Sequence, residues 1–150
     1  MKALRSLIYL LVASSMILLA SCAKPNYEDP QRNPAVEENG TCRAYLAQSN
    51  VCIDLIWDKK PSKEAKGSFY LEFYNPADRS QFIDLQNDLE VVLWMPSMGH
   101  GSAPVKVEKT NPGQYLVSDV YFVMPGDWEI QIKLKNGATV LEQTALPYRY

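Results

Sequence analysis

Hydrophobic and polar residues alternate along most of the chain beyond residue 50. The alternation is clearest over residues 51–57, 89–95 and 128–134, where every second side chain is apolar. Successive side chains of a β-strand point to opposite faces of a sheet, so this pattern predicts half-buried strands. We expect further strands at residues 68–74, 105–109, 114–122 and 139–144, and a short one around Phe82 and Ile83 within the ambiguous segment 78–87.

Turn residues separate these segments at short, regular intervals. Asn75-Pro76 stops one strand, Asn111-Pro112-Gly113 joins the next pair, and Asn136-Gly137 is a strong hairpin signal because both turn positions need positive φ. No segment beyond residue 50 shows the period of a helix. The sequence therefore predicts an all-β domain, an immunoglobulin-like β-sandwich of about seven strands.

The first residues follow a different pattern. Lys2 and Arg5 precede an almost wholly apolar run from Leu7 to Ala20, which is too short for a comfortable transmembrane span and suits a secretory signal peptide. The stretch that ends this run, Leu-Ala-Ser-Cys at 19–22, matches a lipobox, in which small residues precede a cysteine that is acylated. We expect residues 1–21 to be a lipoprotein signal peptide and Cys22 to carry the lipid, since several acyl chains on one residue hold a protein firmly to a membrane.

Residues 22–40 read as the lipidated cysteine and a flexible tether, and residues 41–150 as one domain. The tether contains three prolines and few apolar residues, too few to bury a core. Ala23 follows Cys22, and by resemblance to Gram-negative lipoproteins this favours the periplasmic face of the outer membrane. With Cys22 lipidated, Cys42 and Cys52 form an even pair in an exported chain and are expected to make a disulfide; a thiol metal or redox site is the alternative.

Composition narrows the classes of function. The chain has a net charge of −2, and loss of Lys2 and Arg5 with the signal peptide would make it about −4, without the basic surface of a nucleic-acid binder. The G-x-S-x-G, phosphate-loop and H-E-x-x-H motifs are absent, and the chain has one histidine. We therefore expect a protein that is not an enzyme.

Candidate chemistry gathers in one loop, Met95-Pro96-Ser97-Met98-Gly99-His100-Gly101, directly after a strand. The histidine lies between two glycines, and two methionines precede it closely. Met124-Pro125-Gly126 follows another strand in the same way. Thioether sulfur and imidazole together suit soft copper(I), so Met95, Met98, His100 and Met124 are candidate copper(I) ligands. Met95 and Met124 also continue apolar strand faces and could be core residues, and His100 could instead cap a strand-end carbonyl.

The two blocks L-W-M-P-S-M-G-H-G-S-A-P (93–104) and P-G-Q-Y-L-V-S-D-V-Y-F-V-M-P-G-D-W-E-I-Q-I (112–132) resemble the YtkA-like/FixH-related domain family. Its members carry M-P-x-M-G-H, then G-x-Y, then F-x-M-x-G-x-W. The resemblance implies an immunoglobulin-like sandwich and an association with copper handling and oxidase assembly. Unlike FixH, this chain has the features of a lipoprotein without a transmembrane helix.

Two hypotheses follow. In the first, a membrane-tethered domain holds copper(I) for transfer or sequestration, with a copper protein of the cell envelope as its partner. In the second, the sandwich is a metal-free envelope module that contacts another protein. Two other residues of the 112–132 block are expected to have structural roles: Tyr115 as a corner tyrosine whose hydroxyl ties a loop down, and Trp128 as a core anchor.

Overall fold

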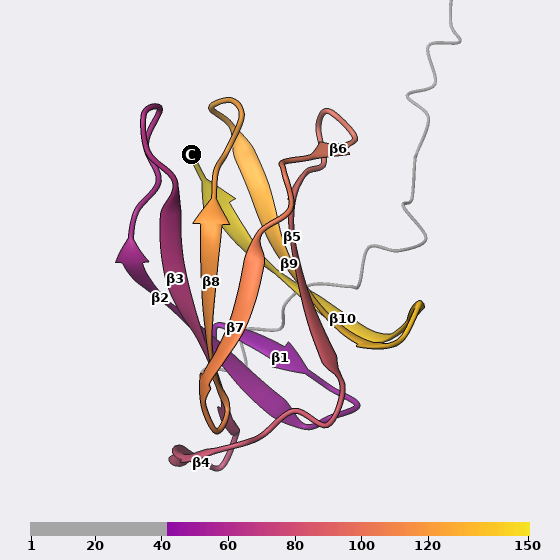
Figure 1. The fold of residues 1–150 in the computed structure, drawn as a ribbon. Coiled ribbons are helices and arrows are strands. Elements are labelled where there is room, and N and C mark those ends of the chain that lie inside the picture. The colour runs from indigo at the N-terminus through magenta and orange to yellow at the C-terminus, as the bar shows by residue number, and fades with distance from the viewer. Residues whose placement is uncertain (1–41) are drawn as a thin grey trace, which may run out of the picture. The chain divides into compact units, whose positions relative to one another are not determined.

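The computed structural model describes residues 42–150, which form ten β-strands in two antiparallel sheets (Figure 1). The strands are β1 (Ala44–Leu46), β2 (Val51–Lys59), β3 (Gly67–Asn75), β4 (Asp78–Phe82), β5 (Asp88–Met95), β6 (His100–Gly101), β7 (Lys106–Asn111), β8 (Gln114–Val120), β9 (Asp127–Asn136) and β10 (Thr139–Arg149). The predicted all-β class and the β-sandwich are confirmed.

The first sheet has the strand order β1-β2-β3-β8-β7, and β4 pairs with β3 at one end. The second sheet has the order β10-β9-β5-β6. Consecutive strands joined by tight turns pair directly, as the turn signals predict: β7 with β8 across Asn111–Gly113, and β9 with β10 across Asn136-Gly137. Strand β7 of the first sheet and strand β5 of the second sheet lie next to each other, on the side of the sandwich that faces the viewer in Figure 1.

The core lies between the sheets and is built from the alternate positions that the pattern singled out. Val51, Ile53 and Leu55 of β2 face Val91 and Leu93 of β5 and the even-numbered apolar residues of β9 in one buried cluster. At the upper end of Figure 1, that cluster becomes aromatic: we call Trp57, Phe122, Trp128, Tyr148 and Tyr150 the aromatic cluster. Ring centroids in this cluster lie 4.8–5.3 Å apart, the usual range for packed aromatic pairs.

The strand number is ten rather than about seven. The additional strands are short: β1 has three residues, β6 has two, and β4 has five that are all exposed. Strands of this length hold too few side chains to show a period of two, and an exposed strand has no apolar face to reveal it. The longer predicted strands are all present.

One departure from strict alternation lies on the outer face of β2. Asp54 is 3% exposed although its neighbours Ile53 and Leu55 face the core. Arg79 of β4 forms an ion pair with the Asp54 carboxylate and lies over the ring of Tyr74, 5.3 Å from its centroid. The short strand β4 thus covers the end of the first sheet and compensates a buried charge, which would otherwise be costly.

Cys42 and Cys52 form a disulfide, as their spacing predicts, with their Cα atoms 5.2 Å apart. The bridge ties Cys42, two residues before β1, to the second residue of β2, and Cys52 is fully buried. The two cysteines therefore form a structural disulfide and not the thiol metal or redox site considered as the alternative.

The signal peptide 1–21, the lipidation site Cys22 and the tether 22–40 lie outside the described residues. Within residues 42–150 there is no helix long and apolar enough to cross a membrane.

Candidate metal centre

A tight turn at the end of β5 presents the candidate ligands. The carbonyl of Met95 accepts hydrogen bonds from the amides of Met98 (3.2 Å) and Gly99 (3.0 Å), so the chain reverses within four residues. Gly99 has φ +64°, a conformation that glycine adopts without the steric cost that a side chain would bring. The turn places residue 100 in β6, alongside the strand it has just left.

The β5–β6 pairing sets Met95 and His100 directly opposite each other. Opposed residues of an antiparallel pair carry their side chains on the same face, with Cβ atoms about 5 Å apart. Met95 is 2% exposed and belongs to the core, so the half-buried His100 ring also lies on the inner face, at the end of the sandwich. Trp94 and Gly101 form the next pair and lie on the outer face.

The indole of Trp128 joins this pair to the segment that carries Met124. The His100 and Trp128 rings meet edge to face with centroids 6.3 Å apart. The Trp128 Nε1 donates a hydrogen bond of 3.0 Å to the carbonyl of Met124. Met124 is half-buried and packs against the core cluster. Trp128 is therefore the core anchor that was expected, and it also holds the backbone of a candidate ligand.

Gly126 brings the same segment against Met95. The Cβ that an alanine would add at position 126 lies 2.7 Å from the Met95 Cε, so the thioether methyl lies against the glycine backbone. Two backbone hydrogen bonds, Gly126 N to Tyr150 O (2.9 Å) and Tyr150 N to Gly126 O (3.0 Å), hold the segment to the end of the chain. The position of Met124 is thus fixed from two sides.

A chain of contacts links three of the four predicted ligand positions at one end of the sandwich: Met95 lies opposite His100, the His100 ring meets Trp128, and Trp128 bonds to the carbonyl of Met124. Met98 lies at the turn between Met95 and His100, and its side chain is 58% exposed. Met95 is also a core residue, as its strand face suggested. These four residues include the chain's one histidine and all of its methionines beyond residue 16.

The hydrogen bond of His100 determines which ring nitrogen is available. Its Nδ1 lies 3.2 Å from the carbonyl oxygen of Gly101. Because a carbonyl only accepts hydrogen bonds, this contact requires a proton on Nδ1, and in the neutral tautomer that makes it the lone pair is on Nε2. Metal-bound histidines commonly show this arrangement, in which a backbone carbonyl fixes the tautomer. The same bond is the strand-end cap considered as the alternative role of His100.

Within residues 42–150, no three histidine, cysteine, aspartate or glutamate side chains lie close enough together to hold a metal ion. The donors that the fold does bring together are thioethers and one imidazole. Such a set is poor for zinc or calcium and suits copper(I), which prefers soft ligands and accepts low coordination numbers.

A family model described as YtkA-like matches residues 46–133, more than half of the chain. The chain belongs to the YtkA-like family. The match contains strands β2 to β8 and most of β9, and with them all four candidate ligands of this YtkA-like domain. No curated protein and no solved structure matches the chain. The further relation to FixH stays a prediction.

Three residues position the YtkA-like site without having been singled out for it. Gly126 and Tyr150 hold the Met124 segment, and Trp128 orients both that segment and the His100 ring. The M-x-G-x-W spacing of 124–128 contains two of the three, so it is the signal that could have identified them. Tyr115 behaves as expected: it is buried, and the backbone of Leu85 hydrogen-bonds to its phenol oxygen.

Proposed function

We propose that this YtkA-like domain binds copper(I) through Met95, Met98, His100 and Met124, as a non-enzymatic carrier in the cell envelope. The observation that supports it most is the β5–β6 register, which sets the single histidine opposite a buried methionine. A thioether and an imidazole on one face, beside a second methionine segment, supply the soft donors of a copper(I) site.

Each donor has a distinct position in this proposal. His100 offers Nε2 because Nδ1 is bonded to Gly101. Met95 supplies a sulfur from the core side, where water has little access. Met124 supplies another from the segment that Trp128 and Tyr150 hold. A site walled by indole and phenyl rings has a low local dielectric, which favours a monovalent soft ion over a strongly hydrated divalent one.

We assign to Met98 the role of the ligand that is replaced first when copper(I) passes to another protein. Its side chain is exposed at the tip of a four-residue turn, where it meets an approaching partner before the other donors do. A carrier needs such a ligand, because transfer proceeds by replacing donors one at a time. The partner we expect is another copper protein of the envelope.

The tether completes the proposal. Cys22 would carry the lipid and residues 22–40 would hold the domain off the membrane surface, with the periplasmic face of the outer membrane favoured. Replacement of Cys22 by serine should move the protein from the membrane fraction to the soluble one. Intact-mass measurement of the wild-type chain should show the added acyl mass. A soluble wild-type chain without that mass would contradict lipidation.

The copper proposal is tested by titrating the purified full-length chain in detergent with copper(I), against a coloured copper(I) chelator under reducing conditions. We expect a dissociation constant below about 1 µM. Substitution of one ligand, Met98→Leu or His100→Gln, should weaken binding by about 10- to 100-fold. Met→Leu keeps the volume and removes the sulfur, so the fold is preserved.

Val123→Ala is the matched control, because Val123 is 47% exposed in the segment that precedes Met124 and offers no donor atom. Its affinity should equal that of the wild type. If the wild-type chain binds copper(I) no better than His100→Gln, the copper proposal is wrong. The Nδ1–Gly101 bond would then be the strand-end cap of a metal-free turn.

A further inference from the structure

Strands β5 and β7 are edge strands of opposite sheets, and they lie side by side on one side of the sandwich (Figure 1). The first sheet ends at β7. In the second sheet, β6 pairs with β5 only at Trp94 and Met95. From Asp88 to Leu93, no strand among the described residues pairs with the outer edge of β5. The sandwich is therefore open along this side.

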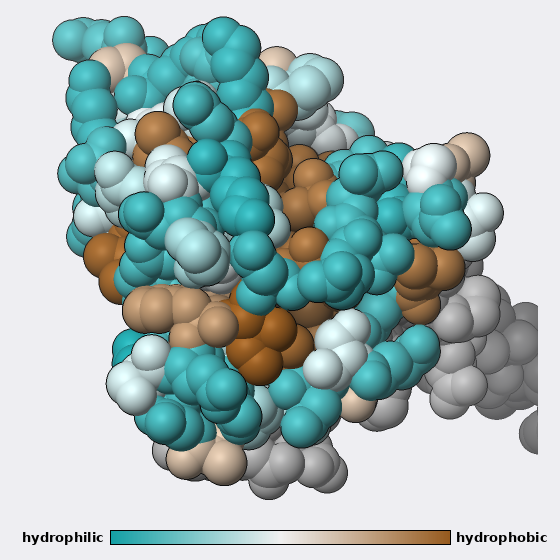
Figure 2. Space-filling view, turned by 60° about the horizontal axis from the view of Figure 1, so that its bottom comes forward, coloured by the Kyte–Doolittle hydropathy of each residue, from teal (hydrophilic) through white to brown (hydrophobic). Residues whose placement is uncertain are grey.

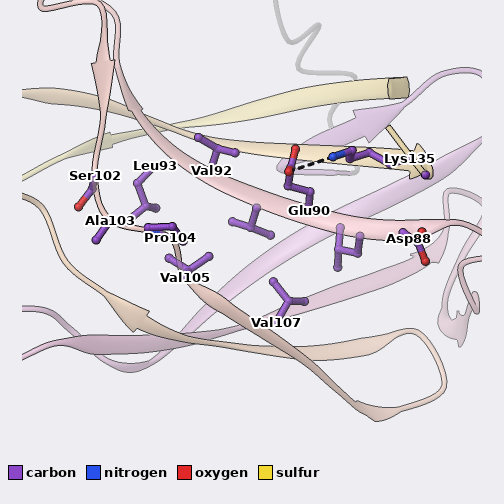
Figure 3. Close-up of a pocket in the computed structure, with 13 residues that line it drawn as sticks. Asp88, Glu90, Val92, Leu93, Ser102, Ala103, Pro104, Val105, Val107 and Lys135 are labelled. Atoms are coloured by element: carbon purple, nitrogen blue, oxygen red, sulfur yellow. Dashed lines mark hydrogen bonds and ion pairs between the residues drawn. The ribbon is translucent and has the colours of Figure 1, made fainter. Parts of the chain in front are cut away.

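A hollow of about 530 Å³ lies at the opening, and we call it the β5–β7 groove. Its apolar surface comes from both sheets: Leu89, Val91 and Leu93 of β5 on one side, Val105 and Val107 on the other. In Figure 3 the side chains of Leu93, Val105 and Val107 point into the space between the two strands. Figure 2 shows apolar residues exposed along a hollow between hydrophilic ridges. The volume of the groove is in the range of ligand-binding sites. The floor of the groove continues into the hydrophobic core.

The backbone of β5 presents hydrogen-bonding groups along the groove. The Leu93 carbonyl accepts a hydrogen bond from the Ser102 amide, 2.9 Å away, so it points away from β9. Both backbone groups of a residue in an antiparallel strand point the same way, and the direction reverses at each residue. The N–H and C=O of Leu89 and Val91 therefore also point away from β9, toward the open edge. An unpaired edge of this kind accepts a further strand.

The rim of the groove carries charged side chains. Glu90 forms an ion pair with Lys135 across the β5–β9 pair, at 3.1 Å (Figure 3). Asp88 lies opposite Lys135 and Glu90 lies opposite Lys133 in the same register, so two carboxylates and two ammonium groups share this face of the sheet. The nearby lysines of β7 are engaged elsewhere, Lys106 with Asp119 and Lys109 with Asp84. Asp88 forms no ion pair among the described residues, so its carboxylate is available to a basic residue of a bound segment.

We propose that the β5–β7 groove binds an extended peptide segment of another protein as an added strand beside β5. Alternate apolar side chains of that segment pack over Leu89, Val105 and Val107, and a basic residue lies beside Asp88. A second copy of this chain fits less well, since two concave grooves facing each other about a two-fold axis leave a larger void. This binding mode gives affinity through main-chain hydrogen bonds and specificity through alternate side chains. It is independent of the copper proposal.

The probe is a fluorescein-labelled peptide of alternating valine and threonine with a lysine at each end, titrated into the full-length chain in detergent. The control is the same peptide with alternate amide nitrogens methylated, which keeps the side chains and removes hydrogen-bond donors. We expect the first peptide to bind and the methylated one to bind at least about tenfold more weakly. The first peptide should also protect the amides of Leu89 and Val91 from hydrogen exchange.

Two exposed carboxylates give a matched pair of variants. Asp88→Lys should weaken binding of the lysine-ended peptide by about threefold and favour a glutamate-ended one. Glu108→Lys makes the same change of charge on β7, outside the groove lining, and should leave both affinities unchanged. Equal binding of the methylated peptide would overturn strand addition and indicate a site for an apolar small molecule or acyl chain. Failure of both peptides to bind would overturn the proposal altogether.

Discussion

The thioether methyl of Met95 lies against Gly126, so close that a Cβ at position 126 would be 2.7 Å from it. Gly126 has φ +148°, a conformation that residues with a side chain rarely adopt. The glycine thus does two things at once: it lets the segment after Met124 turn into β9, and it leaves room for the end of a buried side chain.

Gly126→Ala should therefore displace the Met95 thioether and strain the backbone. We expect the free energy of unfolding to fall by about 2 kcal/mol and, under the copper proposal, copper(I) affinity to fall about tenfold. Urea unfolding and chelator competition measure the two effects. Gly137→Ala is the control: it has φ +57° but open space around it, so it should cost about 1 kcal/mol and leave copper affinity unchanged. Equal copper affinity in both variants would mean that Met95 is not a ligand.

The edge-to-face contact of His100 with Trp128 predicts an optical signal. In the variant Trp57→Phe/Trp94→Phe, Trp128 is the only remaining tryptophan of the three. Silver(I), a redox-inert soft ion, should quench the Trp128 fluorescence when it binds at His100, because the centroids of the two rings are 6.3 Å apart. Adding His100→Gln should remove most of this quenching. Quenching that is unchanged by His100→Gln would place the ion elsewhere.

Loss of the Cys42–Cys52 bridge should destabilise the domain. The two cysteines are ten positions apart, and closing a loop of this size restricts the unfolded chain by about 3 kcal/mol. Cys42→Ala/Cys52→Ala should therefore lower the free energy of urea unfolding by about that amount. The wild type under reducing conditions should show a similar loss, while the double variant should not respond to reductant. A response in the double variant would assign the effect to something other than this bridge.

Asp84 predicts an acid dependence of stability. Its carboxylate accepts a hydrogen bond from the Lys109 ammonium, at 2.8 Å, and one from the Gly113 amide, at 2.9 Å. The bond from Lys109 is the larger cause that holds the pKa of Asp84 below its ordinary value of 3.8, and the Gly113 amide adds to it. A pKa that is lower in the folded state than in the unfolded state gives stability that is present above pH 3.8 and is lost as the pH falls through the folded value.

Asp84→Asn should then reduce stability at neutral pH and flatten the fall in stability below pH 3.8. Urea unfolding at a series of pH values measures both effects. Asp127→Asn is a suitable control, because Asp127 is also ion-paired and exposed but lies at the other end of the sandwich. An unchanged acid slope in Asp84→Asn would assign the acid sensitivity to other carboxylates, such as Asp119, whose pKa is lowered mainly by Lys106 and then by Lys66.

The alternation of apolar residues was sufficient to predict the long strands, because each has one face in the core. It gave the inward direction of Val91, Leu93 and Met95 without any structure. The short strand β6 was missed, and β4 was predicted only as a short strand around Phe82 and Ile83, for the opposite reason. Asp78–Phe82 is exposed throughout, and His100–Gly101 is too short for any period to appear.

The candidate metal centre was predicted as a set of residue types but not as an arrangement. Spacing along the chain could not show that His100 lies opposite Met95, since this depends on the length of the turn and its hydrogen bonds to one carbonyl. The β5–β7 groove was not predicted at all. Leu89 and Val107 have the pattern of ordinary core residues, and only the strand order shows that both belong to sheet edges.

The different burial of the three methionines also determines the order in which they are oxidised. Peroxide converts an accessible thioether to a polar sulfoxide, which is a poor ligand for a soft ion and a poor core residue. Met98 is 58% exposed, Met124 is half-buried and Met95 is 2% exposed, so damage should proceed from the turn inward. Met98, which a partner would meet first, is also the residue whose sulfoxide could be reduced back to the thioether without unfolding the domain.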